Sequence, residues 1–212
     1  MSTKKYSVLT ILFYAAAFFS PAFLPATNQV FATMIAYLLG AAVLVILYLQ
    51  QNEWLSFERK ESNWLKVIAF GLGGIFVAIF LQNIVLQIEQ LFGQEVASEN
   101  TQNIIQIVLQ QPLFAIAVMI GGPIMEEFVF RRAITGFLEK YLNVWLAISI
   151  SSFLFALIHQ DGHLLLYFAL GFFFSLLYYN TGKIWTSILA HVGMNTLVVI
   201  ANILLQSIEL PK

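Results

Sequence analysis

The sequence predicts an all-α fold, a bundle of about seven to eight helices that crosses a membrane several times. Hydrophobic residues make up 60% of the 212 positions and charged residues only 10%, whereas charged residues make up about 25% of a typical soluble domain. The mean hydropathy is +0.84. The apolar residues fall in runs of about 20, the length that a helix needs to cross about 30 Å of hydrocarbon. Lipid is therefore the expected solvent for most of the chain.

Seven apolar runs are predicted to be membrane-spanning helices. They cover residues 6–24, 30–50, 64–88, 113–137, 144–159, 163–179 and 184–205. An eighth element, 100–111, has apolar residues at 104, 105, 108 and 109 with Gln and Asn between them, a spacing typical of an amphipathic helix at the membrane interface. Pro112 then opens the next span, at a position where its missing N–H costs nothing.

The first run follows the basic segment MSTKK and superficially resembles a signal peptide. No A-x-A type cleavage site precedes the next apolar run, and Pro21 and Pro25 follow the first one. We therefore expect a retained first span.

The basic residues predict a protein of the cell membrane with a cytoplasmic N-terminus and an external C-terminus. In this orientation Lys212 is the only basic residue on the outer side. The acidic loop that carries Glu95 and Glu99 lies there as well. The residues on the inner side are Lys4, Lys5, Arg59, Lys60, Lys66, Arg131, Arg132, Lys140 and Lys183.

Charge and composition exclude several classes of partner and chemistry. The net charge is -1 and no run of Lys and Arg is long enough to bind phosphates, so a nucleic-acid partner is not expected. The chain has no cysteine, which excludes a disulfide, a thiolate nucleophile and a sulfur ligand for a metal. No repeat or composition shift divides the chain, so residues 1–212 are predicted to form one membrane domain.

Two adjacent carboxylates, Glu126 and Glu127, stand in the apolar run PIMEEFVFRR. A charge near the middle of a bilayer costs about 3 kcal/mol or more, so such groups usually line a functional cavity. Glu127 and Arg131 are four residues apart and can pair on one helix face, whereas Glu126 is rotated by about 100°. One carboxylate is then structural and the other free to react, the alternative being that both only fill a packing interface. The Gly-Gly-Pro sequence at 121–123 allows a kink or a close helix approach.

The three histidines all lie in the second half of the chain, at His159, His163 and His191. His159 and His163 flank a turn at Asp161-Gly162 that residue counting places near the outer side, whereas Glu126 is expected deeper. A short fifth span, or a turn sunk into a cavity, would let His159 meet Glu126. For His163 we expect interfacial hydrogen bonding, and the spacing HQDGH leaves a role as a metal ligand open.

The last span carries His191 and Asn195 four residues apart, on one helix face. Gly193 between them would let another backbone approach. The alternative to a functional role is a His–Asn hydrogen bond that only joins two helices.

Together these residues can support two chemistries. A carboxylate and an imidazole, Glu126 and His159, can activate water as a general base, while His191 and Asn195 can donate hydrogen bonds to an oxyanion. Alternatively, Glu126, His159 and His191 match the His2Glu ligand count of a catalytic site for one divalent metal such as zinc.

The strings EEFVFR, FALIH and HVGMN resemble, in order and spacing, the EExxxR, FxxxH and HxxxN motifs of the CAAX-protease and bacteriocin-processing family, also called the Abi family of intramembrane proteases. The resemblance covers a catalytic-like core at 112–202, with Arg132 standing where a Gly is common in the family. It implies that Glu126 activates water with help from His159 and that His191 and Asn195 stabilise the oxyanion. It further implies that Glu127 and Arg131 brace the site.

What the resemblance implies for function is an intramembrane endopeptidase, a metalloprotease or a glutamate protease, that cleaves a membrane-associated peptide or protein. The short chain looks like a bacterial member, whose relatives are linked to bacteriocin immunity or peptide maturation. The alternative is a non-catalytic membrane scaffold or immunity factor that binds a partner. A small transporter is disfavoured because the sequence shows no inverted halves.

Overall fold

The computed structural model describes residues 1–58, 63–95 and 98–209, and within these ranges all regular structure is helical. This confirms the predicted all-α class. The elements before the central run are α1 (Thr3–Phe19), η1 (Ser20–Phe23), α2 (Ala26–Leu49), α3 (Trp64–Leu91) and α4 (Glu99–Gln110). Those after it are α8 (Val144–Leu157), α9 (Leu164–Thr181) and α10 (Ile184–Glu209).

The central run is continuously helical from Phe114 to Leu138 but changes its winding along its length. Its α-helical parts are α5 (Phe114–Ile116), α6 (Gly122–Glu126) and α7 (Thr135–Leu138). Two π-helical segments, η2 (Ala117–Gly121) and η3 (Glu127–Ile134), join them.

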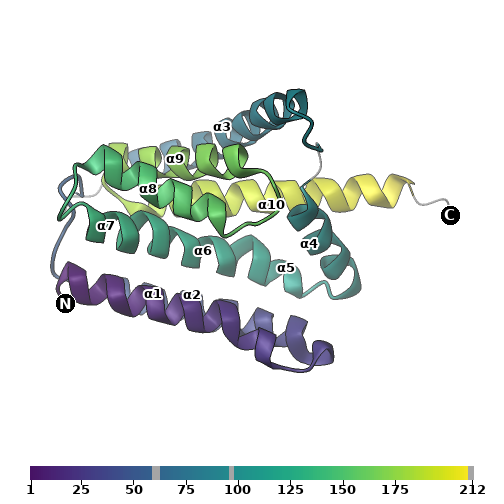
Figure 1. Ribbon diagram of the computed structural model, residues 1–212, viewed down its shortest axis with the longest axis horizontal. Coiled ribbons are helices and arrows are strands. Elements are labelled where there is room, and N and C mark those ends of the chain that lie inside the picture. Colours follow the sequence, from purple (N-terminus) through teal and green to yellow (C-terminus); the bar gives the residue numbers. More distant parts are fainter. Residues whose placement is uncertain (59–62, 96–97, 210–212) are drawn as a thin grey trace.

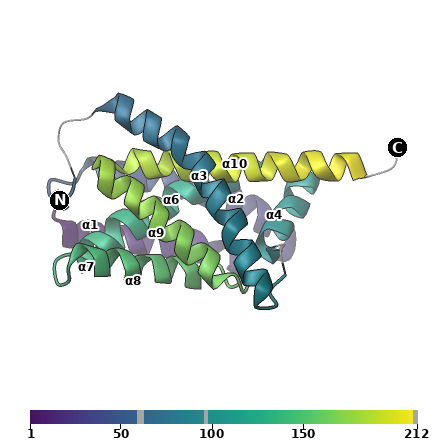
Figure 2. The ribbon, with the colours of Figure 1, turned by 90° about the horizontal axis from the view of Figure 1, so that it is seen from above.

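The central run packs against both halves of the bundle (Figure 1). On one side it contacts the α1–α2 pair, and on the other α8 and α10. Helix α3 packs on α9 and α10 and runs obliquely to α10 (Figure 2). Neighbouring helices therefore cover the central run on several sides.

Five described helical stretches are long and apolar enough to cross a membrane. They are Thr3–Phe23, Ala26–Leu49, Trp64–Leu91, Leu164–Thr181 and Ile184–Leu205. Apolar side chains such as Leu12, Phe76 and Phe80 are 61%, 68% and 67% exposed on them, as expected for a surface that faces lipid. The polytopic membrane bundle is thus confirmed.

Helix α8 is shorter than predicted because it ends at Leu157 after 14 residues. At 1.5 Å per residue it is about 21 Å long, less than the roughly 30 Å of hydrocarbon. The turn that follows α8 lies beside the α3–α4 connection, where the Ser98 hydroxyl donates to Oδ2 of Asp161.

The predicted amphipathic element is present as α4, which buries Ile105 and Val108. Ser98 caps its first turn, since the Ser98 hydroxyl accepts a hydrogen bond from the Thr101 N–H. The helix packs against α5 and α10.

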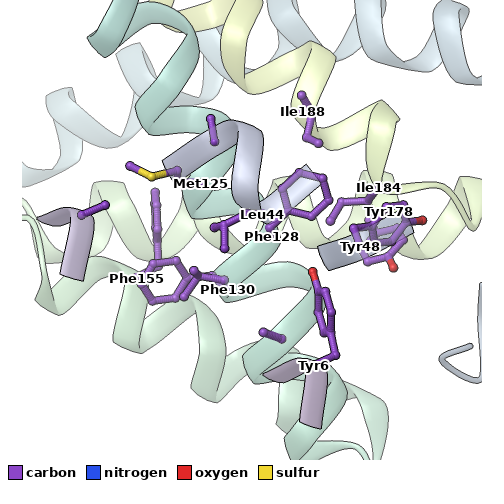
Figure 3. Packing of buried hydrophobic residues seen from close by; sticks show 14 of the residues in the cluster. Tyr6, Leu44, Tyr48, Met125, Phe128, Phe130, Phe155, Tyr178, Ile184 and Ile188 are labelled. Carbon is purple, nitrogen blue, oxygen red and sulfur yellow. The ribbon is translucent and has the colours of Figure 1, made fainter. Parts of the chain in front are cut away.

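The buried apolar core surrounds the central run (Figure 3). Met125, Phe128 and Phe130 of α6 and η3 are at most 3% exposed. Their neighbours in the cluster come from α1, α2, α8, α9 and α10 and include Tyr6, Leu44, Tyr48, Phe155, Tyr178, Ile184 and Ile188.

The first residues of the chain form hydrogen bonds with the connection between α2 and α3. The Met1 ammonium group donates to the Gln50 carbonyl oxygen at 2.9 Å. The Thr3 N–H donates to Oε2 of Glu53 at 2.8 Å, and this hydrogen bond, together with the ammonium group of Lys140 3.3 Å away, lowers the pKa of Glu53 to about 2. Met1, the α2–α3 connection and Lys140 therefore share one end of the bundle.

A buried ion pair secures the same connection to η3. Arg132 Nε lies 3.2 Å from Oε1 of Glu58, with both side chains 0% exposed. Arg132 also donates to the Glu53 carbonyl oxygen at 2.8 Å, while Glu58 accepts hydrogen bonds from the Tyr178 hydroxyl and the Leu55 N–H. Arg132 thus contacts the α2–α3 connection and, with its guanidinium group, the ring of Tyr6 on α1 at 5.2 Å, whereas the contacts of its neighbour Arg131 lie elsewhere.

Candidate active site

The site is built around Glu126, which lies at the boundary between α6 and the π-helical segment η3. Short π-helical segments are rare and frequently mark functional positions because they rotate side chains away from their α-helical directions. In η3 the Phe130 carbonyl oxygen accepts hydrogen bonds from the Thr135 hydroxyl at 2.9 Å and from the Ser151 hydroxyl of α8 at 2.5 Å. A hydrogen bond from α8 thus accompanies the π-helical winding of η3.

Gly121 permits α2 to come close to the central run just before the carboxylates. A Cβ atom at this position would lie 3.2 Å from the backbone carbonyl group of Tyr37. The close helix approach expected from the Gly-Gly-Pro sequence is therefore present.

The two adjacent carboxylates have different surroundings. Glu127 is 0% exposed, and its Oε1 lies 3.3 Å from Nε of Arg131, so the expected ion pair is present. The guanidinium group lies over the ring of Phe155 at 4.1 Å and near that of Phe174 at 5.6 Å. Glu126, by contrast, is 19% exposed and lines a cavity.

His191 links the two carboxylates. Its Nδ1 lies 2.9 Å from Oε1 of Glu127, and its Nε2 lies 3.7 Å from Oε2 of Glu126. The ring stacks on Phe174 with centroids 4.5 Å apart. Because a carboxylate can only accept hydrogen bonds, Nδ1 carries the proton and Nε2 faces Glu126.

His159 enters the cavity from the end of α8. Its Nδ1 lies 2.8 Å from the Phe155 carbonyl oxygen, which fixes the proton on Nδ1 and leaves Nε2 as the acceptor of the neutral ring. The expected conflict in depth does not arise, because His159 and Glu126 line the same cavity. The turn that follows uses left-handed backbone at Gln160 (φ 51°) and Gly162 (φ 86°).

The cavity has a volume of about 690 Å³. It brings together four of the predicted site residues, Glu126, His159, His191 and Asn195, from the central run, the end of α8 and α10. Most of the remaining wall is apolar, with further polar side chains at Thr33, Gln82, Asn83, Ser98, Asn100, Thr101, Gln102 and Asn202. Such a cavity can hold water and hydrogen-bond a peptide backbone inside an otherwise apolar bundle.

His163 is separate from this cavity. Its Nδ1 lies 2.7 Å from Oε2 of Glu89 on α3, and the other oxygen of Glu89 accepts from the Leu166 N–H at 3.1 Å. The expected hydrogen-bonding role of His163 is confirmed. The alternative role as a second metal ligand in HQDGH does not match this position, because the Glu89 carboxylate already engages the ring.

The three candidate metal ligands do not form a metal site in the positions that they occupy. Glu126, His159 and His191 have suitable donor atoms. Among the described residues, however, no three His, Asp or Glu side chains are grouped so that they could hold a metal ion. Nδ1 is hydrogen-bonded in both histidines, so only their Nε2 atoms could serve as ligands. A metal would therefore require these side chains to move from the positions they occupy here.

Gly193 corrects one expectation. A Cβ atom at this position would lie 2.2 Å from Cδ1 of Ile75, so the glycine makes room for a side chain of α3 and not for another backbone.

Several residues around the site were missed by sequence reasoning. Phe174 supports His191, and Tyr167 stacks on His159 with ring centroids 3.7 Å apart. Both are aromatic residues on an apolar helix, where nothing local separates them from ordinary core residues. Glu89 could have been recognised from the sequence, since it is an acidic residue at the end of an apolar run.

The fold and the site together define a class of protein, a helical membrane bundle with carboxylates, imidazoles and an amide around one internal polar cavity. The chain belongs to the CAAX-protease and bacteriocin-processing family. The family description "Type II CAAX prenyl endopeptidase Rce1-like" matches residues 108–197.

Three bacterial relatives show similar sequences. "Putative membrane peptidase YdiL" of Bacillus subtilis (strain 168) is 44% identical over 160 residues, 74% of this chain and 65% of the relative. "Membrane-embedded CAAX protease MroQ" of Staphylococcus aureus (strain USA300) is 30% identical over 184 residues, 82% of this chain and 74% of the relative. "UPF0177 protein YbdI" of Lactococcus lactis is 25% identical over 169 residues, 77% of this chain and 92% of the relative.

The matched part of the chain thus spans just under two thirds of the length of the Bacillus relative. No solved structure matches the chain.

Proposed function

We propose that the protein is an intramembrane endopeptidase that hydrolyses peptide bonds of a membrane-associated peptide or protein. The observation that carries this proposal is the convergence of Glu126, His159, His191 and Asn195 on one polar cavity within the bundle. The names of the Bacillus and Staphylococcus relatives, a membrane peptidase and a CAAX protease, support it.

In the proposed reaction Glu126 accepts a proton from a water molecule as that water attacks the carbonyl carbon of the scissile bond. The unprotonated Nε2 of His159 accepts a hydrogen bond from the same water and orients it. The proton held by Glu126 then passes to the leaving nitrogen as the C–N bond breaks, so the carboxylate is regenerated. The products are a carboxylic acid and an amine.

His191 and Asn195 stabilise the oxyanion of the tetrahedral intermediate. His191 donates from Nε2 while its Nδ1 donates to Glu127, which requires a positively charged ring. The Glu127 carboxylate stabilises that charge, as the carboxylate of a catalytic triad does for its histidine. Arg131 in turn keeps Glu127 charged and in place. Glu127 and Arg131 therefore act from behind the cavity wall.

The central test replaces Glu126 and His159 by glutamine, one at a time, in protein reconstituted in liposomes. A general base contributes about 10²–10⁴-fold to a rate, so Glu126→Gln should reduce cleavage of membrane-associated peptides at least a hundredfold. His159→Gln should also reduce cleavage, because the water loses the imidazole that orients it. Glu99→Gln is the matched control, because it removes an exposed carboxylate of α4 that does not line the cavity. Cleavage at the unsubstituted rate by both cavity variants would contradict the proposal.

The substrate can be sought in bacterial cells that express the protein. Peptide ends in membranes of cells that carry the unsubstituted protein are compared with those of Glu126→Gln cells. A peptide or protein whose cleavage depends on Glu126 is the substrate that we propose. We further propose a role in bacteriocin immunity or peptide maturation, which predicts that Glu126→Gln cells lose protection or accumulate a precursor. Full protection by that variant would indicate a non-catalytic immunity factor.

The metal-free and metal-dependent forms of the proposed reaction make opposite predictions. Without a metal, purified protein contains less than one equivalent of zinc and retains activity with excess chelator. With one divalent metal such as zinc, the chelator removes activity and the metal restores it. Elemental analysis together with the chelator assay distinguishes the two.

A further inference from the structure

Tyr167 of α9 is a buried polar residue that takes no part in the reaction proposed above. Its ring lies nearly parallel to the ring of His159, with an interplanar angle of 19° and centroids 3.7 Å apart. The side chain is largely buried and forms part of the cavity wall. Tyr167 thus contacts a proposed catalytic residue over the whole face of its ring.

The hydrogen bond to Phe155 does not by itself fix the His159 ring. It restrains Nδ1 but leaves the ring free to pivot about that atom, so it does not set the direction of Nε2. Stacking on Tyr167 restrains the plane of the ring. The two contacts together define the direction of Nε2.

The Tyr167 hydroxyl is itself held by a small polar cluster. It donates to Oδ2 of Asp161 at 2.8 Å and lies 3.2 Å from the hydroxyl of Ser98. Ser98 also donates to Oδ2 of Asp161, at 2.5 Å. Asp161 follows His159 by two residues in the same turn, so the cluster supports both the turn and the stacked ring.

Ser98 connects this cluster to α4, because its hydroxyl caps the first turn of that helix through the Thr101 N–H at 3.1 Å. Asn100, Thr101 and Gln102 of that turn line the same cavity as His159. Any movement of the first turn of α4 away from the cavity must therefore break the contact between Ser98 and Asp161.

We propose that Tyr167 is a positioning residue for His159, and that Asp161 and Ser98 make this positioning depend on the seating of α4 against the bundle. The proposal rests on the function proposed above, since it assigns a device that orients the water-binding imidazole. When α4 is seated, Tyr167 is held and Nε2 of His159 points into the cavity. When α4 moves away, Asp161 and Tyr167 lose a partner and the imidazole loses its fixed direction.

The stacking is tested by NMR of protein with isotope-labelled histidine, independently of any activity. The His159 ring signals are assigned by their loss in His159→Gln. In Tyr167→Phe the stack remains and these signals should keep their ring-current shift, whereas in Tyr167→Leu the shift should be lost and the signals should broaden. Phe168→Leu is the matched control on the same helix. Unchanged His159 signals in Tyr167→Leu would overturn the positioning role.

The link to α4 is tested with a single cysteine in a chain that has none of its own. Val108→Cys places a thiol at the buried face of α4, where Val108 is 3% exposed. Asp161→Asn weakens hydrogen bonds to a charged group, so a water-soluble maleimide should react about tenfold faster or more with this thiol. Ser98→Ala should act in the same direction and Ser98→Thr should restore slow labelling. An unchanged labelling rate in Asp161→Asn would overturn the link.

Kinetics on a cleaved peptide complete the test. Tyr167→Leu and Asp161→Asn should lower kcat at least tenfold with little change in KM, because they disturb orientation of the water and not binding of the peptide. Tyr167→Phe, which keeps the stacked ring, should lower kcat less than Tyr167→Leu. If the protein cleaves no peptide, the NMR and labelling results still decide the positioning proposal, so the two proposals can fail separately.

Discussion

His191 and Glu127 form the most direct link between the last helix and the carboxylate pair, with Nδ1 and Oε1 2.9 Å apart. The same carboxylate oxygen lies 3.3 Å from Nε of Arg131. Glu127 thus interacts with Arg131 and His191, whereas Glu126 faces the cavity. The structure therefore divides the pair into a bracing carboxylate and one that is available for reaction.

The bracing pair should show strong energetic coupling. Removing one partner of a buried ion pair leaves an uncompensated charge and costs about 3–5 kcal/mol, whereas removing both often costs much less. We expect Glu127→Gln and Arg131→Met each to lower the free energy of unfolding by about 3 kcal/mol, and the double variant to lose less than the sum. Denaturant unfolding in micelles measures all three.

Glu126→Gln serves as the control for this cycle, because its partly exposed side chain should change stability little. Additive losses in the double variant would show that Glu127 and Arg131 do not act as a pair. Activity should fall in Glu127→Gln even where the protein remains folded, since His191 loses the group that stabilises its charge.

The pairing of Glu127 with Arg131 could be predicted from sequence because a four-residue spacing sets a local geometry. The meeting of His159 and Glu126 in one cavity could not, since it depends on how separate helices pack together. No local signal marked the π-helical winding around Glu126, although the Gly-Gly-Pro sequence indicated the close approach beside it. The cluster of Ser98, Asp161 and Tyr167 joins separate helices, so only the tertiary structure brings it together.

Arg132 should behave differently from its neighbour. It pairs with Glu58 in the α2–α3 connection and makes no contact with the cavity residues named above. We expect Arg132→Met to lower the free energy of unfolding by about 3 kcal/mol, since it leaves the Glu58 carboxylate buried without its charge partner. The folded fraction should nevertheless cleave at the unsubstituted rate.

Comparing specific activity per folded molecule in Arg132→Met and Arg131→Met tests this distinction. A loss of activity in Arg132→Met as large as that in Arg131→Met would mean that the two arginines support the site equally.

Two glycines offer a matched pair of substitutions. A Cβ atom at Gly193 would lie 2.2 Å from Cδ1 of Ile75, whereas one at Gly73 would meet nothing within 4 Å. Gly193→Ala should therefore destabilise the bundle by about 1–3 kcal/mol through overpacking. Gly73→Ala should be neutral or stabilise by up to about 1 kcal/mol, because alanine favours helix more than glycine does.

A second substitution locates the cause of the Gly193 effect. Ile75→Ala removes the atoms that the new methyl group would meet, so it should partly rescue Gly193→Ala in both melting temperature and activity. Absence of any rescue would place the strain elsewhere along α10.

The orientation of the bundle in the membrane follows from the end at which the N-terminus lies. Hydrogen bonds join Met1 to Gln50 and Thr3 to Glu53, so the N-terminus and the α2–α3 connection lie at one end of the bundle. The basic residues predict that this end is cytoplasmic.

Because the chain has no cysteine, Asn52→Cys and Glu95→Cys each supply a single exposed thiol, on the connections before and after α3. In intact cells an impermeant maleimide should label Glu95→Cys and should label Asn52→Cys only after permeabilisation. The reverse pattern would mean that the N-terminus is outside and that the proposed cavity is reached from the opposite face of the membrane.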